Sequence, residues 1–327
     1  MRVFTTTVGH GAELTCYVQD PSEELALKAR PAVLVLPGGG YFFTSDREAE
    51  PVALAYLAEG FNAFVLRYST GADAPFEQSF DDAKAALAWL RASADDLHID
   101  GVAAVGFSAG GHLAASLATA ATNKPDALVV GYPVTLAEFG PPIGKDILDI
   151  PSLVTGETPP TFLFSTCDDV LVPVRNSLEF LSALAAHHVP FESHIYLLGV
   201  HGLSLAKPLT ASGRADHVDE AVAQWLPDSV RFLRAVFGGF TTSGEPETYE
   251  TVLARRVVGM DMPINRLLDD EAGAAALRRH APAVAEAAPL DLSVARSSIR
   301  QLLEQGSGLV TPEAVAGLEA ELTGQGK

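Results

Sequence analysis

A serine flanked by glycines has the spacing of a nucleophile on a sharp turn, in the stretch Gly106-Phe107-Ser108-Ala109-Gly110. An apolar run at 102–105 precedes this stretch, and an alanine- and leucine-rich run at 111–118 follows it. This order predicts a buried strand, a tight turn and a helix, with small residues needed on both sides of the serine. We expect Ser108 to act as a nucleophile and the amide of Ala109 to face the attacked carbonyl oxygen. The simpler alternative is an idle serine in a glycine turn.

A base and an acid are expected downstream, because a serine hydroxyl needs a histidine to take its proton and a carboxylate to orient that histidine. A strand-like run at 161–165 leads to Asp168 and Asp169, and a second run at 193–198 leads to His201. We interpret His201 as the general base and leave the choice between the two aspartates open at this point. Structural roles are expected for three further histidines: His187, His188 and His194.

A glycine run follows another strand-like segment, where the apolar residues 32–36 lead into Pro37-Gly38-Gly39-Gly40-Tyr41. Glycines at this place let backbone amides approach a substrate oxygen without obstruction by side chains. Two amides of this run, together with that of Ala109, would bind the oxyanion of a tetrahedral intermediate. A loop for nucleotide phosphates is disfavoured, because the chain has neither G-x-G-x-x-G nor G-K-[ST] here.

From about Arg30 to Leu205 the sequence resembles a bacterial α/β-hydrolase esterase family, close to acetyl-xylan-esterase-like and feruloyl-esterase-like enzymes and related to the hormone-sensitive-lipase group. The resemblance is carried by PGGGY at 37–41, SDRE at 45–48 with PVA after it, VLRYS at 65–69, GFSAGGHLAAS at 106–116, PPTFLFSTCDD at 159–169, VPVRNSLEF at 172–180 and HGLSLA at 201–206.

The resemblance implies an α/β-hydrolase fold and a set of site residues. Its triad is Ser108, Asp169 and His201, and its oxyanion donors are Gly39, Gly40 and Ala109. The family spacing D-x-x-V-P favours Asp169 over Asp168. No cofactor and no metal are implied.

The stretch between Pro133 and Thr161 departs from the family, because it is shorter than expected and rich in proline. It therefore predicts a shallow acyl pocket, since little apolar wall would cover a long chain. The leading hypothesis is a serine esterase that removes small acyl groups, acetyl above all, from sugar or oligosaccharide esters. An arylformamidase-like or peptidase-like acyl hydrolase on the same scaffold is the alternative. A catalytically idle, hydrolase-derived binding protein is a third.

Composition restricts the partners. The chain of 327 residues is 48% hydrophobic and carries a net charge of −19, which argues against nucleic acid and anionic membranes as partners. Its two cysteines exclude a disulfide framework and a C-x-x-C metal site, and Cys167 is expected to be a small buried packing residue. The N-terminus lacks a signal-peptide core, and no segment reaches the ~18 apolar residues of a membrane span, so a cytoplasmic location is expected.

The coarse pattern predicts a mostly parallel, doubly wound sheet after an antiparallel hairpin at 3–8 and 14–18. Strands are expected around Val33, Ala63, Val102, Leu128, Phe162 and His194, with helices near 51–59, 80–92, 111–121, 174–186 and 219–236.

Three regions are expected along the chain: a catalytic domain at 1–238, a linker at 239–248 and a small helical domain at 249–327. In the last region, Thr311 and Pro312 have the types of a helix cap and a first helical residue. The favoured interpretation of this region is a stabilising or dimerisation module without a ligand, so its helices could hold a homo-oligomer together.

Overall fold

The computed structural model describes residues 1–25, 27–239, 247–251 and 259–324. The chain divides into two compact units, Met1–Thr248 and Tyr249–Lys327. The predicted linker at 239–248 lies mostly outside the described residues, because 240–246 are not among them. Each unit is described by itself below.

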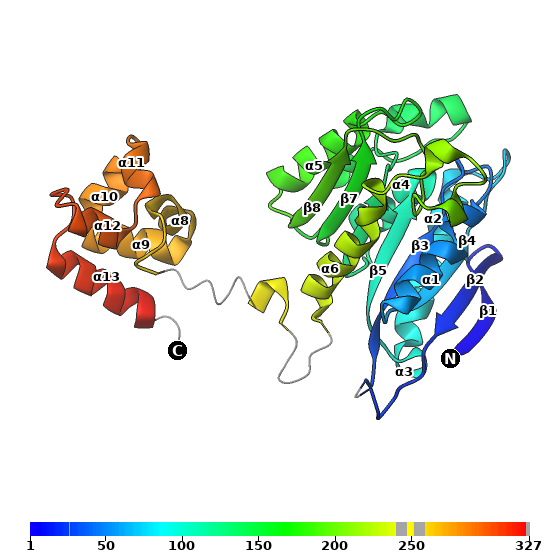
Figure 1. Ribbon diagram of the computed structural model, residues 1–327, viewed down its shortest axis with the longest axis horizontal. Helices are drawn as coiled ribbons and strands as arrows, with labels where there is room; N and C mark the ends of the chain where they lie inside the picture. The colour runs from blue at the N-terminus through cyan, green and yellow to red at the C-terminus, as the bar shows by residue number, and fades with distance from the viewer. Residues whose placement is uncertain (26, 240–246, 252–258, 325–327) are drawn as a thin grey trace. The chain divides into compact units, whose positions relative to one another are not determined.

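The first unit is built on one eight-stranded sheet with the order β1-β2-β4-β3-β5-β6-β7-β8 (Figure 1). β1 pairs with β2 and β2 with β4 in antiparallel fashion, whereas every later pair is parallel. This topology confirms the predicted α/β-hydrolase fold and its entry hairpin. The strands are β1 (Arg2–Val8), β2 (Ala12–Val18), β3 (Arg30–Leu36), β4 (Asn62–Arg67), β5 (Ile99–Phe107), β6 (Ala127–Gly131), β7 (Thr161–Thr166) and β8 (Phe191–Tyr196).

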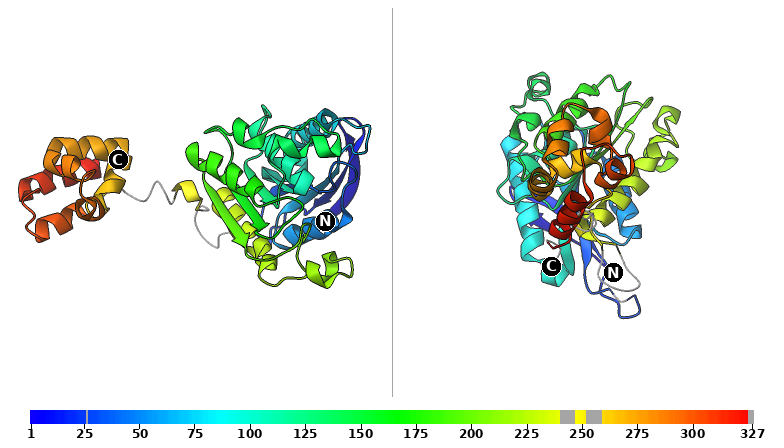
Figure 2. Two further views of the ribbon diagram at one scale, coloured as in Figure 1. Left: turned by 90° about the horizontal axis from the view of Figure 1, so that it is seen from above. Right: turned by 90° about the vertical axis from the view of Figure 1, so that its left-hand side faces the viewer.

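The central strands are buried on both faces, which explains their nearly continuous apolar sequences. In β3, Leu34 and Leu36 pack into one core, while Val33 and Val35 pack into another on the opposite face. Helices α2, α4 and α5 contribute to the first core, and α1 and α6 to the second. The left view of Figure 2 shows the sheet from above, with helices on both of its sides.

The helices of this unit are α1 (Glu50–Ala58), α2 (Phe76–Ala92), α3 (Ala94–Leu97), α4 (Ser108–Thr119), α5 (Arg175–Ala186) and α6 (Trp225–Phe237). Two of them begin earlier than predicted. α2 starts at Phe76, directly after Pro75, and α4 starts at the serine itself. Among the described helices, none is both long and apolar enough to span a membrane.

The predicted helix at 219–236 is wrong in its first turns. The structure has a 3-10 turn at Val222–Gln224, and α6 begins only at Trp225. Pro227 explains the boundary, because a proline has no amide hydrogen and is tolerated only in the first turn of a helix. Asp219 caps the preceding turn, where its carboxylate accepts a hydrogen bond from the amide of Val222 at 2.9 Å.

The second unit is a small helical bundle with its own apolar core, to which Ile264, Leu277, Ile299 and Leu318 contribute. The predicted helix start near Thr311 is confirmed, since the Thr311 hydroxyl accepts a hydrogen bond from the amide of Ala314 at 3.2 Å. Its described helices are α8 (Ile264–Asp269), α9 (Glu271–His280), α10 (Pro282–Ala287), α11 (Leu292–Arg296), α12 (Ile299–Glu304) and α13 (Pro312–Gly324).

Candidate active site

Ser108 lies at the junction of β5 and α4 with a left-handed backbone, at φ 52°. Two glycines make this turn possible by their lack of a side chain. A Cβ atom on Gly106 would lie 2.2 Å from the carbonyl oxygen of Gly110, and one on Gly110 would lie 2.1 Å from that of Leu36. The sharp turn is therefore closed by backbone packing that only glycine permits, and the serine hydroxyl is carried above the sheet.

The structure brings together Ser108, His201 and Asp169, three residues from the ends of three strands. Nε2 of His201 lies 2.8 Å from the Ser108 hydroxyl oxygen, and Nδ1 lies 2.6 Å from Oδ2 of Asp169. The other carboxylate oxygen of Asp169 accepts hydrogen bonds from the amides of Leu171 and Val172, both at 2.9 Å. An ionised carboxylate only accepts, so Nδ1 carries the imidazole proton and Nε2 is free to take the serine proton.

Asp168 is not part of this constellation. Its side chain is exposed to solvent, whereas Asp169 is buried beside the imidazole. Cys167 is also exposed, so the expectation that it packs in the core is wrong. The cysteine follows the last residue of β7, where the chain leaves the sheet and turns toward the surface.

The glycine run after β3 lies beside the serine. Gly39 and Gly40 line the same cavity as Ser108 and Ala109, and both have positive φ, at 135° and 63°. The amide of Ala109 lies in the first turn of α4, where amides have no partner within the helix. Gly39, Gly40 and Ala109 therefore lie beside the serine, where the resemblance implies the oxyanion donors.

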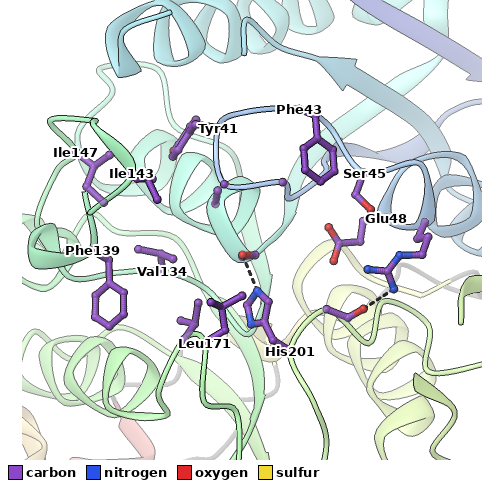
Figure 3. Close-up of a pocket in the computed structure, with 17 residues that line it drawn as sticks. Tyr41, Phe43, Ser45, Glu48, Val134, Phe139, Ile143, Ile147, Leu171 and His201 are labelled. Atoms are coloured by element: carbon purple, nitrogen blue, oxygen red, sulfur yellow. Dashed lines mark hydrogen bonds between the residues drawn. The ribbon is translucent and has the colours of Figure 1, made fainter. Parts of the chain in front are cut away.

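The cavity has two chemically different sides, with a total volume of about 340 Å³ (Figure 3). On one side of Ser108 the wall is apolar, and on the other it carries polar groups and one aromatic ring. The apolar wall includes Tyr41, Val134, Phe139, Ile143, Ile147 and Leu171; the opposite side includes Phe43, Ser45 and Glu48. Arg47 and Gly202 also line the cavity.

The apolar wall is held in place by two buried side chains. The Lys145 amino group donates to the carbonyl oxygens of Gly71, Ala72 and Ala74, and so attaches the stretch after β6 to another loop. Nε2 of His112 donates to the carbonyl oxygen of Leu148 at 2.9 Å. The stretch predicted to leave the acyl pocket shallow therefore supplies much of the apolar wall.

Burial lowers the pKa of His112 to about 4, so its imidazole is neutral near pH 7. Since the carbonyl oxygen of Leu148 only accepts, Nδ1 has no proton and accepts from the Tyr41 hydroxyl at 2.7 Å. This bond ties the glycine loop to α4. Tyr41 also lies in left-handed backbone, at φ 65°.

Sequence reasoning gave no individual role to three residues around the site: Arg47, Glu48 and Tyr132. Arg47 donates to the carbonyl oxygen of Gly202 at 2.7 Å, next to the imidazole, and Glu48 accepts from the Tyr132 hydroxyl at 2.6 Å. The sequence signal for Arg47 and Glu48 is the charged segment 45–48 between a strand and a helix, which carries the family resemblance but gives neither residue a role of its own.

The other histidines of the region do not reach the cavity. His187 and His188 are exposed after the end of α5. His194 lies in β8, where its Nε2 is 3.0 Å from Oε1 of Glu192 and 3.9 Å from Oδ2 of Asp228. The side chains of Glu192, His194 and Asp228 are of types that bind metal ions, and their ligand atoms lie within 4.8 Å of one another. Arg231, however, forms ion pairs with both carboxylates and already supplies a cation there.

Comparison with known proteins places this chain in a family. Residues 20–132 match the family model BD-FAE. The endo-1,4-β-xylanase B of Butyrivibrio fibrisolvens is 32% identical over 216 residues, which are 56% of this chain and 34% of that protein. The chain thus spans about a third of the length of this curated relative.

Two solved structures match this chain over most of their own length. MGS-M1, an α/β-hydrolase enzyme from a Medee basin deep-sea metagenome library, is 42% identical with a TM-score of 0.68, covering 72% of this chain and 98% of that one. The acetyl ester-xyloside bifunctional hydrolase of Caldicellulosiruptor lactoaceticus is 34% identical with a TM-score of 0.60, covering 69% and 88%. On the evidence of its sheet, the sharp turn at Ser108 and these relatives, the chain belongs to the bacterial α/β-hydrolase esterase family.

Proposed function

We propose that this chain is a serine carboxylesterase that removes small acyl groups, acetyl above all, from sugar or oligosaccharide esters. The observation that carries the proposal is the continuous hydrogen-bonded line from Ser108 through His201 to Asp169, of which the serine and the histidine line a two-sided cavity. Nucleophile, base and orienting acid are already within the distances that proton transfer needs.

In the proposed reaction, the Ser108 oxygen attacks the ester carbonyl carbon while its proton passes to Nε2 of His201. The three predicted oxyanion amides donate to the carbonyl oxygen as it becomes negative. The carbon–oxygen bond to the alcohol then breaks, and His201 returns the proton to the leaving oxygen. Water attacks the acyl-serine with His201 again as base, releasing the acid and restoring the serine hydroxyl.

The two sides of the cavity support a division of the substrate. An apolar wall suits an acyl chain, and the side with Ser45 and the Phe43 ring, together with the cavity-lining Arg47, suits a hydroxylated leaving group. Arginine and serine can hydrogen-bond to sugar hydroxyls, and an aromatic face can cover the apolar face of a sugar ring. The relative named as an acetyl ester-xyloside hydrolase supports the same substrate class.

The test is a series of p-nitrophenyl esters from acetyl to octanoyl, measured beside acetylated xylo-oligosaccharides with the full chain. We expect the highest kcat/KM for acetyl and propionyl esters, a decline beyond butyryl, and release of acetate from the oligosaccharides. A kcat/KM that rises steadily to octanoyl would contradict the small-acyl assignment. Hydrolysis of aryl esters without any action on acetylated sugars would contradict the substrate class and leave a general esterase.

A further inference from the structure

Glu48 is a buried carboxylate in the wall of the cavity, and the residue is only 3% exposed to solvent. It ends the short 3-10 helix Asp46–Glu48, which lies between the glycine loop and α1. Both of its oxygens are in use. Oε2 accepts from the amide of Gly38 at 2.8 Å, and Oε1 accepts from the Tyr132 hydroxyl at 2.6 Å. The triad itself does not contain this group.

The first of these bonds fixes the predicted oxyanion loop. Gly38 directly precedes Gly39 and Gly40, the two glycines that line the cavity. Its surroundings leave no room, since a Cβ atom there would lie 2.7 Å from Oε2 of Glu48 and 3.1 Å from Cβ of Ser108. The carboxylate therefore sets how far the glycine loop lies from the serine.

The second bond leads to the imidazole loop. The Tyr132 hydroxyl accepts a hydrogen bond from the amide of Ser204 at 2.9 Å, and its ring lies edge-on to the His201 ring with centroids 5.1 Å apart. Burial and the adjacent Glu48 carboxylate raise the pKa of Tyr132 well above its usual value, so the hydroxyl stays protonated and donates. Tyr132 and Ser204 are held in left-handed backbone, at φ 36° and 53°.

One carboxylate thus connects two loops that lie far apart in the sequence, and Arg47 next to it joins the same loops through its bond to the carbonyl oxygen of Gly202. We propose that Glu48 is a positioning residue, which acts through Gly38 on the oxyanion amides and through Tyr132 on the imidazole. This inference rests on the proposed esterase function and deepens it, because it names what keeps the two halves of the site in register.

Asp82 offers a matched control. It is also a fully buried carboxylate with both oxygens engaged, accepting from the amide of His10 at 2.6 Å and from that of Ser69 at 2.8 Å. It lies in α2 and is not among the residues that line the cavity. If burial alone made such a group important, Asp82 and Glu48 would respond alike to substitution.

The experiment compares wild type with Glu48→Gln, Tyr132→Phe, the double variant and Asp82→Asn, using p-nitrophenyl acetate and thermal unfolding. In Glu48→Gln one oxygen acceptor becomes an amide donor, so either the Gly38 amide or the Tyr132 hydroxyl loses the oxygen to which it donates. We expect kcat to fall about 100-fold, as for a displacement of about 1 Å at a reacting group, with KM close to wild type.

Tyr132→Phe should show the same split between kcat and KM, and the double variant should be no worse than the poorer single variant, because the two residues act as one unit. Asp82→Asn should lower Tm and leave kcat unchanged. If Glu48→Gln does not fold, Tyr132→Phe decides the matter, since it keeps the packed ring.

The negative outcomes are of two kinds: some would overturn the positioning role alone, and one would overturn the proposed function as well. Wild-type turnover that depends on Ser108, together with unchanged kcat in folded Glu48→Gln and Tyr132→Phe, would overturn the positioning role alone. A kcat loss in Asp82→Asn equal to that in Glu48→Gln would do the same. Absence of any Ser108-dependent turnover in wild type would overturn the proposed function and the positioning role with it.

Discussion

Two histidine–carboxylate groups are carried by β8 and by the loop that follows it, and of these two only the group in the loop adjoins Ser108. The side chain of His201 is 14% exposed, and that of its partner Asp169 only 1%, so their bond is sheltered from solvent. His194 is 30% exposed beside the partly exposed carboxylates of Glu192 and Asp228. The residue types are alike, but the surroundings differ.

What separates the two groups is the position of the backbone that carries them. His201 lies in the loop after β8 and reaches the serine hydroxyl, whereas His194 lies inside β8, where its ring packs against Phe162 with centroids 5.4 Å apart. A histidine becomes a candidate base when a loop carries it past the strand end. Inside the strand, the same side chain serves packing and surface charge.

The largest expected effect comes from breaking the group at the serine. Ser108→Ala and His201→Ala should each lower kcat by about 10⁶-fold without loss of the fold, because triad members act as a unit. His194→Ala is the matched control and should leave kcat unchanged. Steady-state assays with p-nitrophenyl acetate, with circular dichroism for folding, check all three. Equal losses in His194→Ala and His201→Ala would erase the distinction between the two groups.

The next effect concerns the acid. Asp169→Asn should lower kcat by about 10⁴-fold, because an amide at this place no longer holds the required tautomer of His201. Asp168→Asn should stay close to wild type, since that carboxylate is exposed. The same assay ranks the two variants. A larger loss in Asp168→Asn would show that the solvent-exposed aspartate is the partner during turnover.

The smallest expected effect concerns a third histidine, the buried His112. It changes how the free energy of unfolding depends on pH. Its pKa is about 4 in the folded chain against 6.5 when unfolded, so the folded state disfavours its proton. The neutral imidazole therefore contributes about 3 kcal/mol to the free energy of unfolding; this stabilisation is fully present above pH 6.5 and is lost as the pH falls toward 4. The free energy of unfolding of His112→Asn should therefore fall less steeply than that of wild type across this window. Parallel slopes in denaturant titrations would contradict the assignment.

Much of the fold was predictable because its signals are local. The apolar strands, the glycine–serine–glycine turn and the order of serine, acid and base can each be recognised within a short stretch of sequence. Long-range contacts gave no such signal. The bond from Glu48 to Tyr132 joins residues 84 positions apart, and only the folded sheet brings them together.

Two local errors have local causes as well. Cys167 was predicted to be buried because a buried strand precedes it, but the chain leaves the sheet one residue earlier. For α6 the predicted start at residue 219 is too early, because the apolar pattern continues upstream through the 3-10 turn Val222–Gln224. The periodic pattern does not reflect that Pro227 restricts where this helix can begin. In both cases the periodic pattern extended past the element that it predicted.

The most direct test of the central claim, that Ser108 is the nucleophile, is covalent trapping. Wild type, Ser108→Ala and His201→Ala are treated with diethyl p-nitrophenyl phosphate, which phosphorylates an activated serine, and are then mapped by peptide mass spectrometry. We predict one adduct on the peptide that contains Ser108 in wild type, with loss of esterase activity, and none in either variant. An adduct on exposed Cys167 or on another serine, or an unmodified Ser108 in an inactivated enzyme, would contradict the account.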